Sequence, residues 1–432
     1  VSPPNTNLIM KWSRYNAILD YESYEVLYNC MNNNLVALDH KLRILLEENQ
    51  ECIERFENIH PEFYQYLLRK KFVIDDNVNE IDEAINLSRN YLNSKQTFYL
   101  IVNPTLDCNL RCWYCYETHL SSSIMDTTTM ERVKRLMDRI ISSSELVRFE
   151  LGFFGGEPLM QFQSVVLPLI IYAQKACLRH QKELSIGFTS NGVYLTRPVV
   201  DKLTELMLTY RFQIPFDGNE YYHNKTKKYA NGRGSYRRII ENVKYGATQG
   251  MVFNIRCNYT PENIASFKDL IAELKYLPSD IISFSFQRVW QTSETDDTRK
   301  VLTELDNMVA EGENAKKNNF DVIYSPCYAD RANSVIVNYN GDVYKCTARD
   351  FAKTKREGKL NEDGTITYEE SYYKRMNALY SNKTCQECII FPICDVCSQK
   401  RLEAISTECL HMYTEKDKYR LIANCVKTVI MR

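Results

Sequence analysis

Fifteen cysteines stand out in this chain of 432 residues, because most of them fall into short-spaced groups. The first group is Cys108, Cys112 and Cys115. A tight loop with this spacing can wrap one iron–sulfur cluster and bind three of its irons, which leaves the fourth iron open. Structural zinc needs a fourth ligand, and only His119 is near. A redox pair of Cys112 and Cys115 would leave Cys108 without a role.

A second group of cysteines lies toward the C-terminus and is also regularly spaced. Its members are Cys327, Cys346, Cys385, Cys388, Cys394, Cys397 and Cys409. Gly341, shortly before Cys346, predicts the turn of a small hairpin. One interpretation of the two CxxC pairs at 385–388 and 394–397 is a zinc ribbon, although the two pairs are close together in the sequence for a zinc ribbon. The other five cysteines are expected to be core thiols or inert surface residues.

Composition excludes several classes of protein. Acidic and basic side chains nearly cancel, 55 against 54, so no global field favours nucleic acid or an anionic membrane as a partner. The longest apolar stretch, 165–173, is far shorter than the roughly 18 residues that a membrane span requires. Trp12, Arg14 and Tyr15 interrupt the region where a signal peptide would be apolar. We therefore expect a cytoplasmic protein with reduced thiols and neither a nucleic-acid nor a membrane partner.

The elements that must position the first cysteine group alternate between apolar strands and helix-length segments. Such alternation is typical of βαβ units with parallel strands. Six strands are too few for a closed eight-stranded barrel, so an open, partial (β/α)6 barrel is expected. The predicted strands are Phe98–Val102, Val147–Phe154, Leu184–Thr189, Phe212–Phe216, Val252–Tyr259 and Ile281–Gln287. Cys108 to Cys115 follow the first of these, at the edge where parallel sheets carry their active sites.

The regions on either side of the barrel differ from it. The first 95 residues predict a hairpin of Tyr24–Cys30 and Leu35–Leu38, two helices, the first of which Asp39 can cap, and a strand at Phe72–Ile74, which together resemble a winged helix. A further amphipathic segment covers Ile81–Leu92. The end of the chain is rich in cysteines and loops and is expected to need metal to fold. The predicted domains are therefore 1–95, 96–315 and 316–432, and the fold class is α/β.

The motif at Cys108, Cys112 and Cys115, with the aromatic Tyr114 before the last cysteine, resembles the signature of the radical S-adenosylmethionine (SAM) superfamily. The resemblance implies a 4Fe-4S cluster whose open iron binds SAM and whose electron cleaves it to a 5′-deoxyadenosyl radical. Tyr114 would lie beside the adenine.

Other residues at the ends of the predicted strands extend the resemblance. Strand two ends in a GGEP motif, in which the glycines would let the backbone approach the cofactor and the glutamate would accept its hydrogen bonds. Strands three to five end in residues that contact the cofactor in relatives, although Pro215 stands near the place of a common serine. The implied cofactor-binding residues are Tyr114, Gly155, Gly156, Glu157, Pro158, Ser190, Asn191, Asp217, Arg256 and Asn258.

The C-terminal cysteines resemble a SPASM domain, which holds auxiliary 4Fe-4S clusters. The family pattern implies one cluster on Cys327, Cys346 and Cys397, and another on Cys385, Cys388, Cys394 and Cys409. Two departures are visible. Only two residues separate Cys394 from Cys397 where relatives have three, and 321–324 lack the extra cysteine of some relatives. One auxiliary cluster is therefore expected to have an open iron or a non-cysteine ligand.

Together these features resemble maturases of ribosomally made peptides. The resemblance implies that the N-terminal module binds the leader of a precursor peptide, which we place along a strand edge at Phe72–Ile74. The expected reaction is an oxidative modification, such as a thioether or carbon–carbon crosslink. An external donor such as flavodoxin or ferredoxin would supply electrons. No catalytic acid or base can be assigned from the sequence.

Two alternatives remain. One is an anaerobic sulfatase-maturating enzyme that makes formylglycine. Relatives of that type carry an aspartate after the cysteine that matches Cys346 and lack the N-terminal module, whereas this chain has Thr347 there. The other is a non-enzymatic iron–sulfur or zinc regulator that binds DNA through the winged helix. Against it, the second helix offers only Arg69, Lys70 and Lys71, and a regulator has no need of a GGEP motif.

Overall fold

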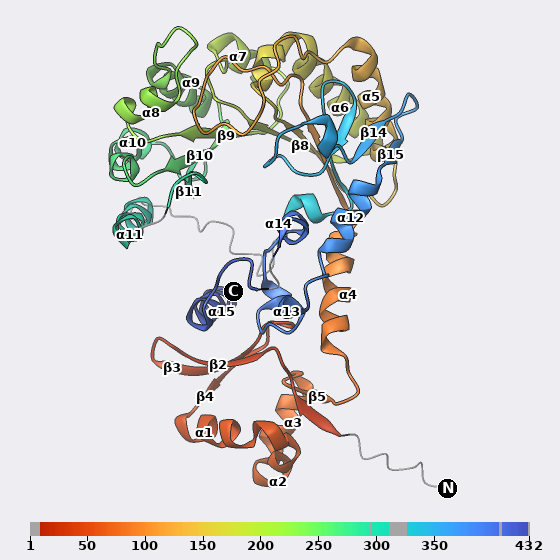
Figure 1. Ribbon diagram of the computed structural model, residues 1–432, viewed down its shortest axis with the longest axis vertical. Helices are drawn as coiled ribbons and strands as arrows, with labels where there is room; N and C mark the ends of the chain where they lie inside the picture. Colours follow the sequence, from red (N-terminus) through yellow and green to blue (C-terminus); the bar gives the residue numbers. More distant parts are fainter. Residues whose placement is uncertain (1–8, 294–295, 311–325, 406–407, 431–432) are drawn as a thin grey trace. The chain divides into compact units, whose positions relative to one another are not determined.

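The computed structural model describes residues 9–293, 296–310, 326–405 and 408–430. Contacts divide the chain into two compact units (Figure 1). The first unit combines residues 1–93, 319–332 and 374–432, and the second combines 94–318 and 333–373. The contacts therefore do not follow the three consecutive ranges expected from the sequence, and the predicted boundary at 315/316 lies outside the described residues. The division by function into three domains stays a prediction.

The second unit is built on one large sheet whose strands run mostly in parallel. Its six parallel strands β6 to β11 confirm the predicted open barrel, with ends within two residues of those expected. They are β6 (Thr97–Val102), β7 (Arg148–Phe153), β8 (Glu183–Thr189), β9 (Tyr210–Phe216), β10 (Val252–Tyr259) and β11 (Ile282–Arg288). The helices between them are α5 (Thr127–Ile141), α6 (Leu167–His180), α7 (Arg197–Thr204), α8 (Glu220–Thr226), α9 (Tyr236–Thr248) and α10 (Phe267–Leu274), and α11 (Asp296–Ala310) follows β11.

Four later strands extend the same sheet beyond β6. They are β12 (Ser334–Val337), β13 (Asp342–Tyr344), β14 (Gly358–Leu360) and β15 (Ile366–Tyr368). β12 is parallel to β6, and each later strand is antiparallel to the one before it. Gly341 has a φ of 81° in the hairpin between β12 and β13, which confirms its predicted place in the turn. The strands that precede and follow Cys346 thus belong to the barrel sheet.

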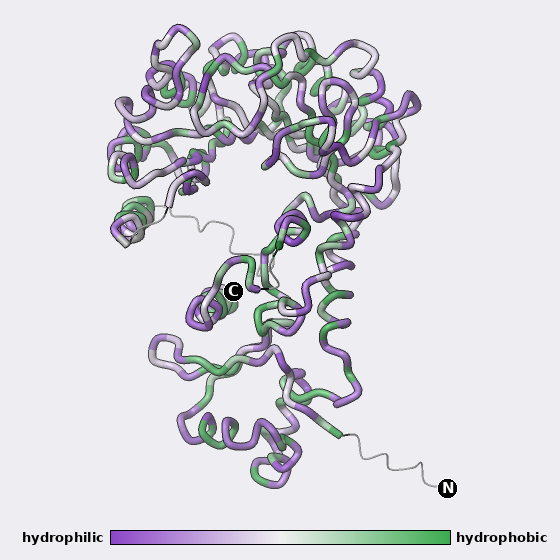
Figure 2. Tube along the Cα trace, viewed as in Figure 1, coloured by the Kyte–Doolittle hydropathy of each residue, from purple (hydrophilic) through white to green (hydrophobic). Residues whose placement is uncertain are grey.

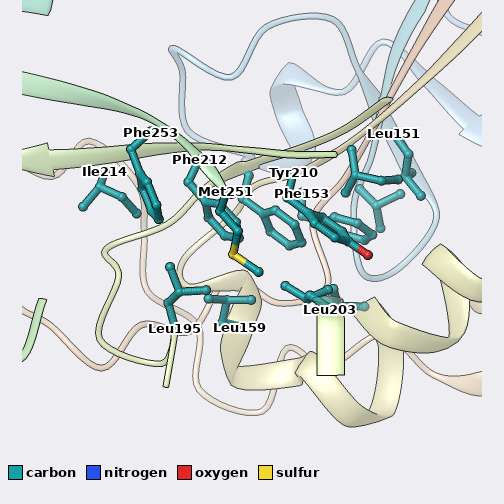
Figure 3. Close-up of a cluster of buried hydrophobic side chains, with 14 of the residues drawn as sticks. Leu151, Phe153, Leu159, Leu195, Leu203, Tyr210, Phe212, Ile214, Met251 and Phe253 are labelled. Carbon is teal, nitrogen blue, oxygen red and sulfur yellow. The ribbon is translucent and has the colours of Figure 1, made fainter. Parts of the chain in front are cut away.

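A row of stacked aromatic rings holds the parallel strands in register. Phe153, Phe188, Phe212 and Phe253 are direct neighbours on β7, β8, β9 and β10. Ring centroids are 5.2, 4.6 and 5.6 Å apart along the row. Figure 3 shows part of this row, with Phe153, Phe212 and Phe253 among aliphatic side chains such as Leu159 and Leu203. Burying these large rings fixes the register, so that the strand ends carrying polar residues meet at one edge.

The N-terminal part of the first unit contains the predicted elements in the predicted order. A sheet of β2 (Asn16–Tyr21), β3 (Tyr24–Asn29) and β4 (Leu35–Leu38) is followed by α1 (His40–Asn49), α2 (Phe56–Ile59), α3 (Pro61–Arg69) and α4 (Glu80–Leu92). Asp39 caps α1 by accepting a hydrogen bond from the Leu42 amide, as its position predicts. Hydrophobic and hydrophilic residues alternate along α4, as in an amphipathic helix (Figure 2).

The strand expected at Phe72–Ile74 exists, but the exposed edge expected there is wrong. β5 (Val73–Asp75) pairs with β1 (Met10–Trp12), a strand that the sequence did not suggest. Phe72, Val73 and Ile74 are only 0%, 1% and 8% exposed. Phe72 and Val73 complete the core between β1 and α3, and Ile74 pairs with Lys11 of β1, so this segment is buried and offers no exposed edge.

The C-terminal part of the first unit shares a hydrophobic core with the N-terminal part. This part contains α13 (Lys383–Gln386), α14 (Ser398–Glu403) and α15 (Glu415–Ile430), while α12 (Glu370–Ala378) leads into it. Side chains of the β2–β3 hairpin and of α4 pack with the cysteine-rich loop and α15. The core includes Tyr15, Val26, Tyr28, Ala84, Ile85, Ile390, Phe391, Ile393, Ile422 and Val426. Among the described residues, no helix is long and apolar enough to cross a membrane.

Candidate active site and auxiliary cysteine groups

The first cysteine group lies in the loop after β6, at the carboxyl end of the parallel strands. Cys108 and Cys112 are half-buried and Cys115 is exposed. Ser123 Oγ accepts a hydrogen bond from the Leu106 amide at 2.8 Å, and Thr105 Oγ1 accepts one from the Asp107 amide at 2.9 Å. These bonds brace the connection just before Cys108. Cys108 Sγ then lies 3.6 Å from Asn191 Nδ2, directly after β8.

The two glycines of the GGEP motif lie where the cysteine loop touches β7. Gly155 has a φ of 109°, and a Cβ atom on it would lie 2.3 Å from the Thr105 carbonyl oxygen. A Cβ atom on Gly156 would lie 2.1 Å from the Asp107 carbonyl oxygen. Only glycine allows this contact. The close approach of the cysteine loop therefore explains why both positions are glycine. The expected contact of these glycines with the cofactor stays a prediction.

Glu157 is fully buried and joins the ends of two strands. Its Oε1 accepts hydrogen bonds from the Leu159 amide at 3.0 Å and the Ser190 hydroxyl at 2.8 Å, and its Oε2 accepts one from the Asn191 amide at 2.7 Å. Burial raises the pKa of Glu157 to about 7, against the lowering effect of these three donors. Pro158 follows as a buried residue at the start of a short 3-10 helix. The carboxylate retains capacity for one further donor.

Ser190 and Asn191 connect Glu157 with the cysteine loop. Asn191 Nδ2 lies 3.6 Å from Cys108 Sγ and donates to Asn109 Oδ1 at 2.8 Å. Both residues are almost fully buried. The structure therefore brings the predicted residues of strands two and three together around Cys108.

A buried charge pair lies at the end of β9, beside the cysteine loop. Asp217 is 1% exposed, and its Oδ2 lies 3.7 Å from Lys227 Nζ without a hydrogen-bond partner. Lys227 Nζ lies 3.5 Å from Cys112 Sγ and 5.3 Å from the centre of the Tyr114 ring. Although burial lowers the pKa of Lys227, Cys112, Tyr114 and Asp217 raise it well above its usual value. Lys227 is thus a buried cation next to the cluster loop.

Lys227 is the functional candidate that the sequence did not reveal. It lies among Lys225, Thr226 and Lys228 in a polar stretch that looks like solvated surface. No motif or periodicity distinguishes it from its neighbours, because its burial depends on the fold of α8 and the turn that follows.

The last predicted cofactor residues meet at the end of β10. Asn258 Nδ2 donates to the Tyr114 hydroxyl at 3.0 Å, and Arg256 Nε donates to Asn258 Oδ1 at 3.0 Å. Pro215 lies beside Arg256 in the neighbouring strand β9 and offers no side-chain donor. Asn258 therefore contacts the hydroxyl of the tyrosine whose ring lies near Lys227, and Arg256 acts on it only through Asn258.

Exposed aromatic residues surround the site where β11 ends. The rings of Tyr116 and Trp290 are stacked 6.2 Å apart, and the Arg349 guanidinium lies 5.3 Å from the Trp290 ring. The Tyr116 hydroxyl donates to the Thr347 carbonyl oxygen at 2.7 Å. Gln291 Nε2 donates to the Tyr114 carbonyl oxygen at 3.3 Å. The loops after β6, β11 and β13 are thereby joined across the open side of the barrel.

The second cysteine group is divided between the two units. Cys385, Cys388 and Cys394 pack against the core that the N-terminal and C-terminal parts share. Tyr413 lies within electrostatic range of both Cys394 and Cys409. These four cysteines form the set that the family pattern assigns to one auxiliary cluster.

Cys327 and Cys397 lie within hydrogen-bonding contact of each other in the first unit. Cys346 follows β13 in the second unit, where its sulfur receives the Ala348 amide at 3.3 Å. Its place in one cluster with Cys327 and Cys397 stays a prediction. The segment 321–324, which lacks the extra cysteine, falls outside the described residues.

The distances between potential ligand atoms bear on the alternative in which the C-terminal cysteines bind zinc. Thiolates bound to one zinc at about 2.3 Å would lie about 3.8 Å from one another. Within the described part of the chain, Cys394, Asp395 and His411 form the one set of three potential ligands whose atoms all lie within 4.8 Å. Asp395 and His411 are already paired at 2.7 Å. No set of three cysteines in that part of the chain is this compact.

The comparisons with known proteins agree with this geometry. Residues 102–287 match the Radical SAM superfamily. An uncharacterised protein of Methanocaldococcus jannaschii is 23% identical over 256 residues, which are 57% of this chain and 84% of that protein. A serine-type anaerobic sulfatase-maturating enzyme of Bacteroides thetaiotaomicron is 24% identical over 167 residues. That match covers 36% of this chain and only 38% of the enzyme.

Two solved structures share the fold over larger parts of the chain. The anSMEcpe structure with bound AdoMet and Cp18Cys peptide matches with a TM-score of 0.59 at 17% identity, covering 78% of this chain and 100% of that chain. Streptococcus suis SuiB bound to the precursor peptide SuiA matches with a TM-score of 0.54 at 15% identity, covering 94% and 100%. At these identities the likeness concerns the fold. The family match covers the sheet that carries the cysteine loop, so residues 102–287 form a Radical SAM domain, which implies a 4Fe-4S cluster and S-adenosylmethionine.

Proposed function

We propose that this enzyme is a peptide maturase that oxidatively modifies a ribosomally made precursor peptide. The observation that carries the proposal is the match to SuiB bound to its precursor peptide, which covers 94% of this chain. That coverage cannot be reached without most of residues 1–93, so the likeness extends to the N-terminal module as well as to the barrel. The anSMEcpe structure with a bound peptide shares the barrel fold.

The residues at the carboxyl edge of the barrel fit the cofactors of a radical SAM enzyme. Three thiols would hold the 4Fe-4S cluster, which supplies the electron that cleaves SAM to a 5′-deoxyadenosyl radical when both are bound. Asp217 Oδ2 is buried without a hydrogen-bond partner, so it is available to a hydroxyl or amino group of the cofactor. Lys227 offers a buried positive charge for a carboxylate.

The other predicted residues would orient the cofactor around Tyr114. Asn258 holds the Tyr114 hydroxyl, and Arg256 holds Asn258. Glu157 keeps one acceptor position for an amino group after binding three protein donors. Because all of these groups are fixed by hydrogen bonds before the cofactor arrives, little reorganisation is needed on binding.

The auxiliary cysteines would provide the electron acceptor that an oxidative modification requires. Crosslinking removes two hydrogens from the peptide, one as an abstracted atom and the other as a proton with an electron. We assign that electron to one of two auxiliary 4Fe-4S clusters, on Cys327, Cys346 and Cys397 and on Cys385, Cys388, Cys394 and Cys409. An external flavodoxin or ferredoxin would supply the electron for SAM cleavage.

The leader of the precursor would bind along the free edge of β4. Among the described strands, β4 pairs only with β3. The Asn29 amide donates to the Asn34 carbonyl oxygen, and hydrogen-bonded pairs alternate along antiparallel strands. The amides of Leu35 and Ala37 therefore point away from β3. Ala37 is exposed, so an extended peptide can pair with this edge.

A sulfatase-type maturase is the second candidate, favoured by the sequence match to the sulfatase-maturating enzyme. Against it, Thr347 stands where such relatives are expected to carry an aspartate, and its carbonyl oxygen already accepts the Tyr116 hydroxyl. The radical SAM domain leaves no support for a non-enzymatic regulator.

Mass spectrometry distinguishes the two enzymatic functions. The full-length enzyme is incubated with SAM, a reductant and a candidate precursor peptide, and the products are analysed. Loss of one pair of hydrogens per modification, with all sulfur retained and no aldehyde that reacts with a hydrazine, is the expected result, because oxidation of serine to formylglycine also removes two hydrogens. Conversion of a cysteine or serine to formylglycine would instead establish the sulfatase-type function. SAM cleavage without any change in the peptides tested with leader would contradict the proposed substrate class.

A further inference from the structure

Arg401 is a buried cation without a counter-ion in the cysteine-rich part of the first unit. It lies on α14 and is 8% exposed. Its Nε donates to the Val396 carbonyl oxygen at 3.3 Å, while its Nη1 is shielded from solvent and has no hydrogen-bond partner. Within the described residues, no carboxylate lies within ion-pair distance of its guanidinium. A buried, unpaired charge of this kind costs several kcal/mol, so an anion is expected beside it.

The cavity that Arg401 lines contains cysteines from both auxiliary sets. Cys327 and Cys394 line it together with Asp330 and Tyr380. More of the lining comes from 391–396, around Cys394, than from 326–330, around Cys327. Phe391, which also lines the cavity, packs in one core with Cys385, Cys388 and Cys394, so Arg401 lies beside the set that contains these cysteines.

The two acidic residues of the cavity already have partners. Asp330 accepts hydrogen bonds from the Ser398 amide at 3.1 and 3.2 Å. Asp395 is paired with His411 at 2.7 Å. Ser398 is a neutral partner, so Asp330 keeps its charge, but neither carboxylate lies within ion-pair distance of the Arg401 guanidinium. The thiolates remain, and a 4Fe-4S cluster on four of them carries net negative charge.

We propose that Arg401 is the buried counter-charge of the auxiliary cluster on Cys385, Cys388, Cys394 and Cys409, donating from Nη1 to a sulfur of that cluster. The proposal rests on the auxiliary clusters of the proposed function. Reduction adds a negative charge to the cluster, and a nearby buried cation stabilises the reduced form more than the oxidised form. Arg401 thus makes this cluster the better electron acceptor. It acts as a positioning residue and does not touch the substrate.

Lys418 is a second cation at this cluster, but it differs from Arg401. Its Nζ contacts Cys388 and also pairs with Glu415 at 2.6 Å. Its charge is therefore partly neutralised on the solvent side. The difference predicts that loss of Arg401 shifts the reduction potential more than loss of Lys418.

The test uses full-length protein in which Cys108, Cys112 and Cys115 are replaced by alanine, so that only the auxiliary clusters remain. This background should hold about 8 irons if both are of the 4Fe-4S type. Potentials are measured by redox titration followed by EPR for Arg401→Met, Arg401→Lys and the control Arg420→Met. Arg420 is an exposed arginine of the same unit. A background without iron would reject the auxiliary clusters themselves, which is a separate result.

Arg401→Met should make one auxiliary cluster at least tenfold harder to reduce, a shift of about 59 mV for one electron. Arg401→Lys should recover part of the shift, and Arg420→Met should cause none. Equal potentials in Arg401→Met and the background, or an equal shift in Arg420→Met, would overturn the proposal.

If Arg401→Met does not bind its iron–sulfur clusters, the iron content of the variants tests the proposal in place of the potentials. Loss of iron in Arg401→Met but not in Arg401→Lys supports the role of the charge, whereas loss in both assigns Arg401 to packing and overturns the proposal. If inorganic phosphate stabilises the iron-free protein only when Arg401 is present, and the potentials do not change, the cavity binds a free anion and the proposal is wrong.

Discussion

The two cysteine regions of this protein are held in place by different means. The loop of Cys108, Cys112 and Cys115 is continuous with β6 and is fixed by backbone contacts to the neighbouring strand, including those at Gly155 and Gly156. Cys385, Cys388 and Cys394 instead pack against a hydrophobic core built with the first 93 residues. The first site therefore depends on the barrel, whereas the second depends on a segment that is distant in sequence.

Removing the first cysteine group should have the largest effect on one region and leave the other intact. Replacing Cys108, Cys112 and Cys115 together by alanine should abolish formation of 5′-deoxyadenosine, because the cluster that donates the electron loses its ligands. The protein should lose about 4 irons and retain the rest. Chromatography of the products and iron analysis provide the measurement.

Cys177→Ala is the matched control, because Cys177 is a buried cysteine of α6 far from the strand ends in sequence. It should retain both iron and activity. If the triple variant still forms 5′-deoxyadenosine, the reactive cluster lies elsewhere.

A cavity in the shared core should damage the second region alone. Ile422 of α15 is fully buried in that core, and Ile422→Ala should destabilise the first unit by about 2–5 kcal/mol. The variant should lose auxiliary iron on mild heating and continue to cleave SAM. Iron content and 5′-deoxyadenosine formation are measured on the same sample.

Ile240→Ala makes a comparable cavity in the second unit, because Ile240 of α9 is 2% exposed in the core of that unit. It should reduce SAM cleavage before it affects auxiliary iron. Loss of SAM cleavage in Ile422→Ala to the same degree as in Ile240→Ala would show that the two regions are not independent.

The buried Glu157 should make the stability of the second unit depend on pH. Its pKa rises from 4.5 in the unfolded chain to about 7 in the folded protein. The folded state binds the proton of Glu157 more tightly than the unfolded chain does, so protonation stabilises the folded state. This stabilisation is complete below pH 4.5 and is lost as the pH rises through 7. When the pH rises from 4.5 to above 7, the free energy of unfolding of the iron-free wild type should fall by roughly 2–4 kcal/mol more than that of Glu157→Gln.

Urea unfolding of the iron-free proteins measures this difference in the free energy of unfolding. Unfolding is followed by the fluorescence of Trp113 and Trp290 in a Trp12→Phe background. Trp12 is removed because it lies in the first unit. A difference between wild type and Glu157→Gln that does not change with pH would show that Glu157 does not titrate in this range.

The smallest expected effect concerns the free edge of β4. Ala37→Pro removes one outward amide without disturbing the pairs with β3, so it should weaken leader binding about tenfold, the effect of roughly one hydrogen bond. SAM cleavage should not change. Ala37→Val retains the amide and is the control, and calorimetry with a precursor peptide measures the affinity.

Equal affinity of both variants would place the leader elsewhere. A point variant is preferable to deletion of the N-terminal module, because deletion would remove Tyr28, Val26 and the other side chains of that module that cover the auxiliary cysteines.

The sequence by itself determined the features whose cause is local. Strand periodicity predicted β6 to β11 and the open barrel, and Asp39 predicted the start of α1, because these depend on neighbouring residues. The cysteine spacing and the GGEP motif placed the cluster loop, Glu157, Ser190 and Asn191 at one edge, since parallel strands end together.

Only the tertiary structure decided which distant segments share a core or a buried charge. It placed β12 beside β6, buried Phe72–Ile74 under β1, and joined the first 93 residues to the cysteine-rich end. It also buried Lys227 and Arg401, which in sequence look like any other exposed cations. Burial results from packing between segments far apart in the chain, and a local pattern carries no record of those contacts.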